Sequence, residues 1–370
     1  MKHVVLLKAK AGNAGGLEKY ASRIASAFRA KGARVSILTT GSVSAEGVYN
    51  LPTTSWPAFL RMEQFDRAVQ DWLKKNQAHL VFGMDRNRFQ THIRAGNGVH
   101  AAYLESRTLT EGWMKRWTCK FNPLHLKILA LEREAFENPL LQKLFTNSQM
   151  VRGQILERFQ TDPNKIQVIH NGVEWHEMQT DFDSWKELKP TLAREKGLDP
   201  NCFQFLFIGN GYLRKGLDRL LEGLQRLKFD FQLSVIGKDN KLDEYRAKAH
   251  RLGLGSRVFF FGAQADIRPF YQIADVLVIP SFYDPFANVT VEALAMGLFV
   301  VSSKQNGGCE ILTPQNGAII PDLLDVNALV DTLEKATQHP KKAASSLLAR
   351  QSVEQLDFSR QLTTLIEACE

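Results

Sequence analysis

The chain is 370 residues long, which usually exceeds what one hydrophobic core serves and therefore predicts two domains. With 44% hydrophobic and 23% charged residues, the composition is typical of a soluble enzyme and excludes a largely disordered chain. The net charge of +8 predicts an acidic partner, which could be a nucleotide diphosphate, an anionic membrane surface or nucleic acid.

Neither a signal peptide nor a spanning helix is predicted. The apolar run within the first ten residues, M-K-H-V-V-L-L-K-A-K, is too short for a signal peptide, and no apolar stretch approaches the ~18 residues of a spanning helix. The four cysteines share no C-x-x-C spacing, which predicts reduced structural thiols (Cys119, Cys202, Cys309, Cys369). We therefore expect a cytoplasmic protein.

The N-terminal segment predicts a strand, a glycine loop and a helix. The run from Val4 to Leu7 leads into A-G-N-A-G-G-L-E, and a helical pattern follows through Phe28. Gly15 and Gly16 at the helix start would let a ligand approach the backbone, although a tight turn alone would also explain two glycines. A further strand is predicted over residues 34–39.

Two later segments of the first half carry candidate functional groups. Residues 94–103, R-A-G-N-G-V-H-A-A-Y, place Asn97 and His100 in a glycine-rich stretch, where His100 could act as a base or be an ordinary hydrogen-bonded residue. Residues 113–128 combine cations with aromatic and aliphatic residues at helical spacing. This pattern predicts an interfacial helix on anionic lipid or an ordinary core helix with solvated lysines, and Pro123 should split it near Asn122.

The first half ends in a strand and a turn. The run from Ile166 leads to Asn171-Gly172, where glycine permits a positive φ. Asp181 and Asp183 then form a D-x-D motif in a polar segment. We expect a solvated hinge there, and a metal site is the weaker alternative.

The second half begins with a buried strand over 203–208 and then N-G-Y-L-R-K-G. Arg214 and Lys215 precede a helical pattern that starts at Leu217, a position at which two cations can clamp a leaving diphosphate. Strands are also predicted over 232–237, 258–262, 276–280 and 299–302. Strands that alternate with helices predict a doubly wound parallel sheet, with ligands at the carboxyl ends of its strands.

The segment D-P-F-A-N-V-T-V-E-A after the strand at 276–280 carries the densest group of candidates. A helix should start near Asn288, with the N–H groups of Ala287, Asn288 and Val289 free to bind phosphate. Asp284 and Glu292 could both face a ligand there. A surface helix with ordinary charged residues is the alternative. A loop is expected over 307–310, and a helical tail from about residue 339.

This segment resembles the E-x7-E element of retaining nucleotide-sugar glycosyltransferases, which have two facing Rossmann-like domains in the GT-B architecture, and in particular that of lipopolysaccharide core glucosyltransferases. The glycine loop at Gly15-Gly16, the 94–103 segment, I-H-N-G-V and R-K-G are similar to further motifs of that family, in the same order. The resemblance implies an acceptor-binding domain over 1–178, a nucleotide-sugar-binding domain over 179–349 and a C-terminal helix, 350–370, that packs back on the first domain.

The resemblance also implies roles for individual residues. Asp284 would contact the donor sugar and Glu292 the ribose, although Asp284 replaces the usual Glu. Asn97 stands where the family has an acid, and it cannot accept a proton. The implied catalytic residues are His100, Asn97, Arg214, Lys215 and Asp284. The implied nucleotide-sugar contacts are Gly15, Gly16, Gly209, Arg214, Lys215, Phe286, Ala287, Asn288, Val289 and Glu292.

A member of this family would move a hexose, such as glucose from UDP-glucose, to a lipid-linked saccharide such as the lipopolysaccharide core. We expect no cofactor and no metal, because protein cations would take the metal's role. Residues 113–128 would attach the enzyme to the cytoplasmic face of the inner membrane. The alternatives are a catalytically altered homologue that binds nucleotide sugar or membrane, a sugar-nucleotide epimerase and a phosphorylase. The basic composition also leaves a nucleic-acid partner open, although we expect none because the cations are dispersed along the chain.

Overall fold

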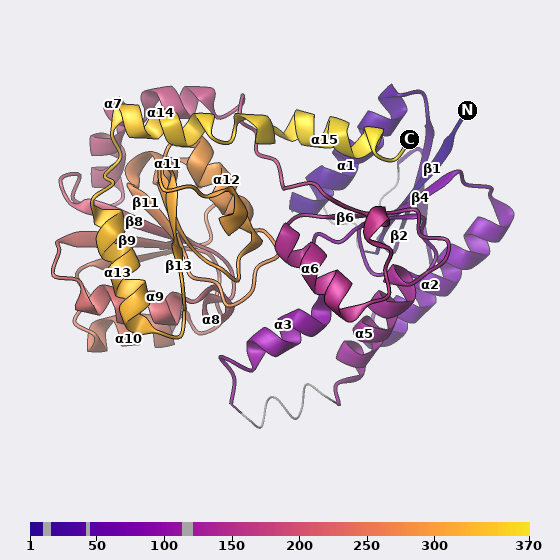
Figure 1. The fold of residues 1–370 in the computed structure, drawn as a ribbon, viewed down its shortest axis with the longest axis horizontal. Coiled ribbons are helices and arrows are strands. Elements are labelled where there is room, and N and C mark those ends of the chain that lie inside the picture. Colours follow the sequence, from indigo (N-terminus) through magenta and orange to yellow (C-terminus); the bar gives the residue numbers. More distant parts are fainter. Residues whose placement is uncertain (10–15, 42–44, 113–120) are drawn as a thin grey trace. The chain divides into compact units, whose positions relative to one another are not determined.

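The computed structural model describes residues 1–9, 16–41, 45–112 and 121–370. The chain divides into two compact units (Figure 1). The first unit contains residues 1–170 and 361–370, and the second contains residues 171–360. Each unit is an α/β domain built on its own parallel sheet, as the alternation of strands and helices predicts.

The sheet of the first unit has seven strands, all of them paired in parallel. The predicted strands over 4–7 and 34–39 are confirmed, the first with one more residue at each end. In spatial order the strands are β3 (Val48–Asn50), β2 (Arg34–Thr39), β1 (His3–Lys8), β4 (Leu80–Gly83), β5 (His92–Arg94), β6 (Lys143–Thr146) and β7 (Ile166–Val168).

Helices of the first unit pack their apolar faces on this sheet. On α1, Ile24 and Phe28 are buried against Leu6 of β1, and Leu365 and Ile366 from the C-terminal end of the chain join the same cluster. Burying a side chain of this size contributes roughly 1.5–3 kcal/mol. The helices are α1 (Gly16–Ala30), α2 (Ala58–Lys75), α3 (His100–Arg107), α5 (Pro123–Phe136), α6 (Gln149–Arg158) and the last part of α15 (Phe358–Glu367).

The sheet of the second unit has six parallel strands. Its order reverses between β8 and β11, the point at which Rossmann-type sheets bind their ligands. In spatial order the strands are β10 (Val258–Gly262), β9 (Phe231–Ile236), β8 (Phe203–Ile208), β11 (Val276–Ile279), β12 (Phe299–Ser303) and β13 (Gly317–Ile320). The strands predicted in this half agree to within a residue.

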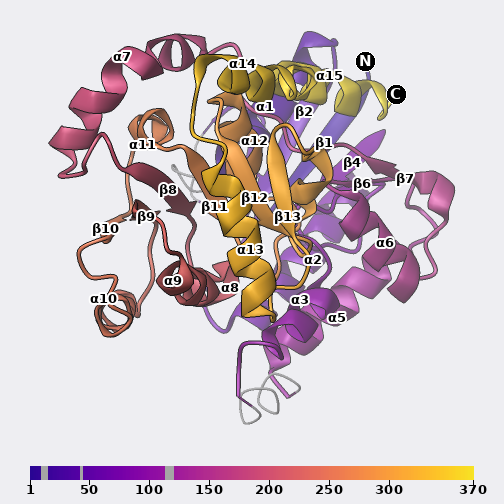
Figure 2. The same cartoon turned by 60° about the vertical axis from the view of Figure 1, so that its left-hand side comes forward.

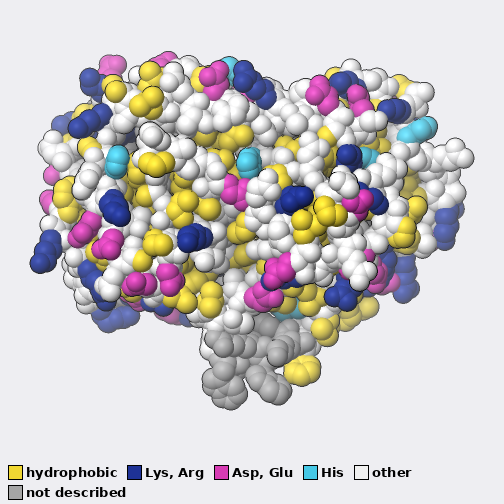
Figure 3. Space-filling model, in the orientation of Figure 1, with side chains coloured by type: hydrophobic (Ala, Val, Ile, Leu, Met, Phe, Trp, Pro, Cys, Tyr) yellow, Lys and Arg dark blue, Asp and Glu magenta, His cyan; other side chains and the backbone are white. Residues whose placement is uncertain are grey.

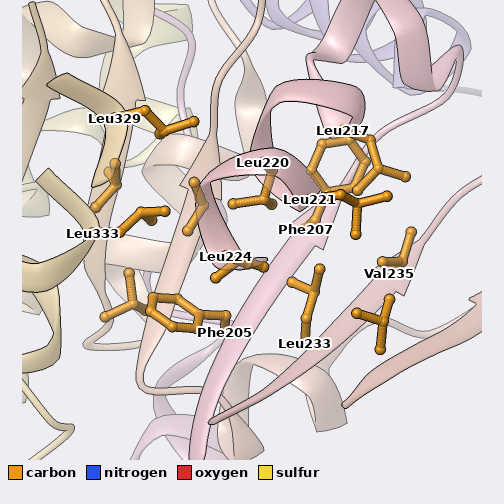
Figure 4. Close-up of a cluster of buried hydrophobic side chains, with 14 of the residues drawn as sticks. Phe205, Phe207, Leu217, Leu220, Leu221, Leu224, Leu233, Val235, Leu329 and Leu333 are labelled. Carbon is orange, nitrogen blue, oxygen red and sulfur yellow. The ribbon is translucent and has the colours of Figure 1, made fainter. Parts of the chain in front are cut away.

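Side chains on its central strands alternate between two cores. Phe205 and Phe207 of β8 enter one hydrophobic cluster, and Leu206 between them enters the other. Helices α9 (Leu217–Arg226) and α13 (Val326–Thr337) pack on the sheet in the first cluster (Figure 4). The leucines at positions 217, 220, 221 and 224 lie on one face of α9 and are buried in this cluster. A buried sheet with helices on both faces explains why these strands read as continuous apolar runs.

Further helices cover the second cluster. Helices α12 and α14 pack against each other (Figure 2), whereas α13 belongs to the first cluster. Met296 and Val291 of the α12 segment and Trp185 of α7 are buried in this cluster. The remaining helices of the second unit are α7 (Gln179–Glu195), α8 (Tyr212–Lys215), α10 (Leu242–Arg251), α11 (Arg268–Ile273), α12 (Asn288–Ala295) and α14 (Ala343–Gln351).

Three expectations differ from the structure. The hinge expected at Asp181 and Asp183 is wrong, because both residues lie in α7, where Asp181 pairs with Arg268. The loop expected over 307–310 is a short 3-10 helix, Gly307–Ile311. The domain bounds also differ: residues 171–178 and 350–360 belong to the second unit, and only residues 361–370 of the tail join the first. Arg350 is anchored in the second unit, because its buried guanidinium donates to the Ala295 carbonyl at 2.6 Å. Within the described ranges, no helix is both long and apolar enough to cross a membrane.

Candidate active site

The sequence-predicted residues of the second unit gather at the carboxyl ends of β8 and β11. The loop from Gly209 to Gly211 follows β8, and the segment 280–287 follows β11. The strands β8 and β11 are neighbours and parallel, so both loops leave the same edge of the sheet. The predicted strand-to-helix crossovers therefore face one another at the switch point of this sheet.

Two glycines allow these loops to approach. A Cβ on Gly209 would lie 2.9 Å from Cγ of Lys215, so the lysine stem packs directly on the glycine backbone. Gly216 has a φ of +78°, and a Cβ there would lie 1.8 Å from the Pro280 carbonyl oxygen. Only glycine fits this second position without moving the chain.

Arg214 and Lys215 come just before α9, which begins at Leu217 as the sequence predicted, and they form the last turn of a one-turn helix, α8. Lys215 has a side chain only 11% exposed, and its Nζ forms an ion pair with Oδ2 of Asp284. Arg214 is 37% exposed, and its Nη1 donates to the Tyr283 carbonyl at 2.9 Å and lies 3.6 Å from the same Asp284 oxygen. Two cations and one carboxylate thus converge on one point.

The backbone of Asp284 is fixed by the loop that follows β12. Its N–H donates to the Gln305 carbonyl, and its carbonyl accepts from the Gly307 N–H, both at 2.9 Å. Asp284 and Asn306 therefore form an isolated parallel bridge. This bridge holds the carboxylate within reach of Lys215.

The start of α12 agrees with the prediction at Asn288, with one correction. The N–H of Ala287 is not free, because it donates to Oδ1 of Asn306 at 3.0 Å. The N–H groups of Asn288 and Val289 make no hydrogen bond to any described residue. These two donors, at the positive end of the helix dipole, remain available for an anion.

Asn306 is a site residue that sequence reasoning missed. It is fully buried, and Oδ1 accepts from Ala287 and Gly308 while Nδ2 donates to Ser302 and Thr290, at distances of 2.9 to 3.3 Å. A side-chain amide can make four such bonds, and this one makes all four. The N-G-G sequence that starts three residues after the end of β12 was the available signal.

Glu292 and Phe286 have different surroundings. Oε2 of Glu292, one turn inside α12, accepts a hydrogen bond of 2.7 Å from the Tyr271 hydroxyl. Burial raises the pKa of the Glu292 carboxyl, and the Tyr271 hydrogen bond opposes that rise. The Phe286 side chain is packed in the hydrophobic core, so this predicted contact residue is placed to support the loop.

The candidates of the first unit are less concentrated. Gly15 lies outside the described residues, and Gly16 is the first residue of α1. Asn97 is exposed in the turn between β5 and α3, and it makes no hydrogen bond to any described residue. His100 is the first residue of α3, and no hydrogen bond joins it to Asn97 within the described chain.

His100 connects α3 to α5. Its backbone N–H donates to the Glu132 carboxylate at 2.9 Å, and its Nε2 lies 3.0 Å from Nδ1 of His125. Burial, and then the nearby charge of Arg86, lowers the pKa of His100 to about 4, so the ring is neutral at pH 7. This arrangement joins two helices, and a catalytic role for His100 stays a prediction.

The predicted interfacial stretch is described only from residue 121. Helix α5 begins at Pro123, with Asn122 accepting from the Leu124 N–H at 2.9 Å, as expected from the proline. Phe121 and Leu126 are 69% and 52% exposed. Lys127 is not free for lipid, because it forms an ion pair with Glu63 of α2. The cations at 115, 116 and 120 lie outside the described residues.

Both units match models of known families. Residues 189–346 match the model described as glycosyl transferases group 1, and residues 14–176 match the model described as glycosyltransferase family 4. Lipopolysaccharide glucosyltransferase WaaG of Escherichia coli K12 is 25% identical over 354 residues, which cover 93% of this chain and 92% of the relative. An uncharacterized glycosyltransferase of Methanocaldococcus jannaschii, MJ1607, is 26% identical over 80% of this chain and 79% of its own.

Solved structures have the same fold. The crystal structure of WaaG superposes with a TM-score of 0.79 at 24% identity and 98% coverage of both chains. Anabaena Alr3699/HepE, solved in complex with UDP-glucose, superposes with a TM-score of 0.68 at 18% identity, over 99% of both chains. At these identities the superpositions establish the two-domain architecture alone.

Proposed function

Because the chain belongs to the group 1 glycosyltransferases with the GT-B fold, we propose that it moves glucose from UDP-glucose to a saccharide on a lipid carrier, with retention of configuration. The relative named a lipopolysaccharide glucosyltransferase supports this acceptor class, and the structure solved with UDP-glucose supports this donor. The first of these relatives also supports an acceptor of the lipopolysaccharide-core type.

The observation that carries the proposal is the convergence of Arg214, Lys215 and two N–H groups of α12 at one edge of the sheet. A UDP-sugar carries a diphosphate that needs cationic and N–H partners. The partly exposed guanidinium of Arg214 can bind two phosphate oxygens at once, and the buried ammonium of Lys215 beside it supplies a compact positive charge. Asp284 and Glu292 supply acceptors for sugar and ribose hydroxyls.

The proposed chemistry is electrostatic. As the bond between the anomeric carbon and the diphosphate oxygen lengthens, negative charge grows on UDP, and Arg214, Lys215 and the helix start stabilise it. The departing phosphate oxygen takes the proton from the acceptor hydroxyl on the same face of the sugar, and the new glycosidic bond forms there. The step needs no protein base beside Asn97, and it leaves UDP and the extended saccharide as products.

Attachment to anionic lipid is the proposed role of the stretch 113–128. The exposed side chains of Phe121 and Leu126 support this role in the part that is described. Nucleic acid is less favoured as a partner. On the face drawn in Figure 3, Lys and Arg are scattered among Asp, Glu and apolar side chains and form no continuous stripe.

Transfer of radiolabelled glucose from UDP-glucose to lipopolysaccharide truncated in its core tests the function. The expected result is a labelled lipid product, with UDP released in equal amount. UDP-glucose binding without transfer or hydrolysis would instead support the catalytically altered homologue that Asn97 and Asp284 leave open. An epimerase would convert the donor to its isomer with no acceptor present.

A further inference from the structure

Tyr271 lies behind the proposed ribose-binding residue. It belongs to α11, is 1% exposed, and donates its hydroxyl proton to Oε2 of Glu292 at 2.7 Å. Oε1 of Glu292 makes no hydrogen bond to any residue of the described ranges. One carboxylate oxygen is therefore held, and the other remains available to accept from a ligand.

The other end of Tyr271 is also fixed. Its carbonyl lies in the last turn of α11, where helix carbonyls lack an internal partner, and it accepts from Nζ of Lys341 at 2.9 Å. Nζ of Lys341 also lies 4.7 Å from the centre of the Trp185 ring, which α7 supplies. A short helix with one end anchored in this way cannot easily turn its tyrosine away from Glu292.

We propose that Tyr271 is a positioning residue for donor binding, which holds Glu292 in the orientation that accepts from the ribose hydroxyls of UDP-glucose. This inference rests on the proposed function and adds a residue to it. Tyr271 touches no part of the donor in this account. It acts through the one carboxylate oxygen that it holds.

The hydrogen bond has a consequence for the pH dependence of binding. A phenol that donates to a carboxylate stabilises its charged form, and here it opposes the rise in the Glu292 pKa that burial causes. Among the described titratable groups, only Tyr271 acts on Glu292 in this way. Removal of the hydroxyl should raise the pKa of Glu292 further, so the carboxyl would be protonated at a higher pH and would lose its acceptor role there.

The test measures the affinities of UDP and of 2′,3′-dideoxy-UDP by calorimetry between pH 5 and pH 8, for the wild type and Tyr271→Phe. The ratio of the two affinities isolates the ribose hydroxyls, because both ligands carry the same titrating phosphates. For Tyr271→Phe we expect the ratio at pH 7 to fall roughly 3- to 10-fold, the net worth of one typical hydrogen bond, because the substitution acts on the ribose contact only through Glu292. The pH at which the ratio declines should also move upward.

Two variants complete the test. Tyr245→Phe removes the hydroxyl of another buried tyrosine of the same unit and should leave the ratio unchanged. Glu292→Gln should give a ratio that is low and independent of pH. An unchanged ratio and pH profile in Tyr271→Phe would overturn the positioning role while UDP binding itself persists. Failure of the wild type to bind UDP would instead overturn the proposed function.

Discussion

Nζ of Lys215 and Oδ2 of Asp284 form an ion pair that joins the loop after β8 to the loop after β11. Both side chains are only 11% exposed, so the pair is largely shielded from water. The cation assigned to the diphosphate is therefore held in place by the carboxylate assigned to the donor sugar. The substitution of Asp for the usual Glu at position 284 still leaves this contact in place.

Lys215→Ala should reduce kcat roughly 100- to 1,000-fold, because it removes a preorganised positive charge from the departing diphosphate. The fold should survive, since Arg214 remains 3.6 Å from the Asp284 carboxylate. Lys335→Ala, an exposed lysine of α13, is the matched control and should keep full activity. The rate of UDP release at saturating UDP-glucose and acceptor gives kcat for both variants. Full turnover by Lys215→Ala would refute the diphosphate clamp.

The ion pair itself can be measured with a double-mutant cycle. Lys215→Ala and Asp284→Ala should each destabilise the protein, because each leaves a shielded charge with fewer partners. The double variant should be more stable than the sum of the two losses implies, with a coupling free energy of about 1–3 kcal/mol. Chemical denaturation of the three variants and the wild type gives the value. Additive losses would mean that the two charges do not interact in solution.

Two substitutions of Asn306 separate an added charge from lost hydrogen bonds. In Asn306→Asp the oxygens can still accept from Ala287 and Gly308, but the donations of Nδ2 to Ser302 and Thr290 are lost. The new charge is buried, so the protein should lose stability, although the positive end of α12 offsets part of the loss. The same charge should repel the diphosphate and raise the KM for UDP-glucose roughly 10-fold, with relief at high salt. Asn306→Ala should also lose stability, because several buried groups are left without partners, but it adds no charge and should change the KM for UDP-glucose less. Equal effects of the two variants on KM would contradict this.

Alanine substitutions at the two glycines that flank α8 distinguish the cost of backbone strain from the cost of steric overlap. Gly211 and Gly216 have φ values of +72° and +78°, but a Cβ on Gly211 meets nothing within 4 Å, whereas one on Gly216 meets the Pro280 carbonyl at 1.8 Å. Gly211→Ala should therefore cost about 1 kcal/mol from strain alone. Gly216→Ala should cost several times more, or prevent folding. Comparable unfolding temperatures for the two variants would contradict the predicted clash.

The neutral His100 should make stability depend on pH. Its pKa is about 4 in the folded protein against an ordinary value of 6.5, so the unfolded chain takes up a proton first as the pH falls. The stability that His100 contributes is complete above pH 6.5 and is lost as the pH falls toward 4, by roughly 2 kcal/mol at pH 5. Unfolding temperatures of the wild type and His100→Gln at pH 8 and pH 5 test this sign. The wild type should lose more on acidification than the variant does.

Local sequence patterns predicted much of the second unit. Continuous apolar runs marked β8, β9, β11 and β12, and the strand-to-helix crossovers placed Arg214, Lys215 and Asn288 at one edge. The strands β3, β5 and β13 were missed, because three or four residues are too few to show an alternation of apolar and polar side chains. The D-x-D motif at Asp181 suggested a hinge because its polar residues concealed the buried face of α7.

Contacts between distant residues could not be read from the chain. Asn306 reaches Ala287 over 19 positions and Tyr271 reaches Glu292 over 21, and neither pair has a local spacing rule. The same limit explains why the N–H of Ala287 was expected to be free. His100 and His125 meet only because α3 and α5 pack together. A single sequence records the residue types of such networks, but tertiary packing decides which of them meet.

A crystal soaked with UDP tests the central claim most directly. We predict that its β-phosphate oxygens lie within about 3 Å of Nζ of Lys215 and of the N–H groups of Asn288 and Val289, with Arg214 turned toward the same group. Phosphates bound elsewhere in the second unit, with Lys215 still paired only to Asp284, would contradict the account.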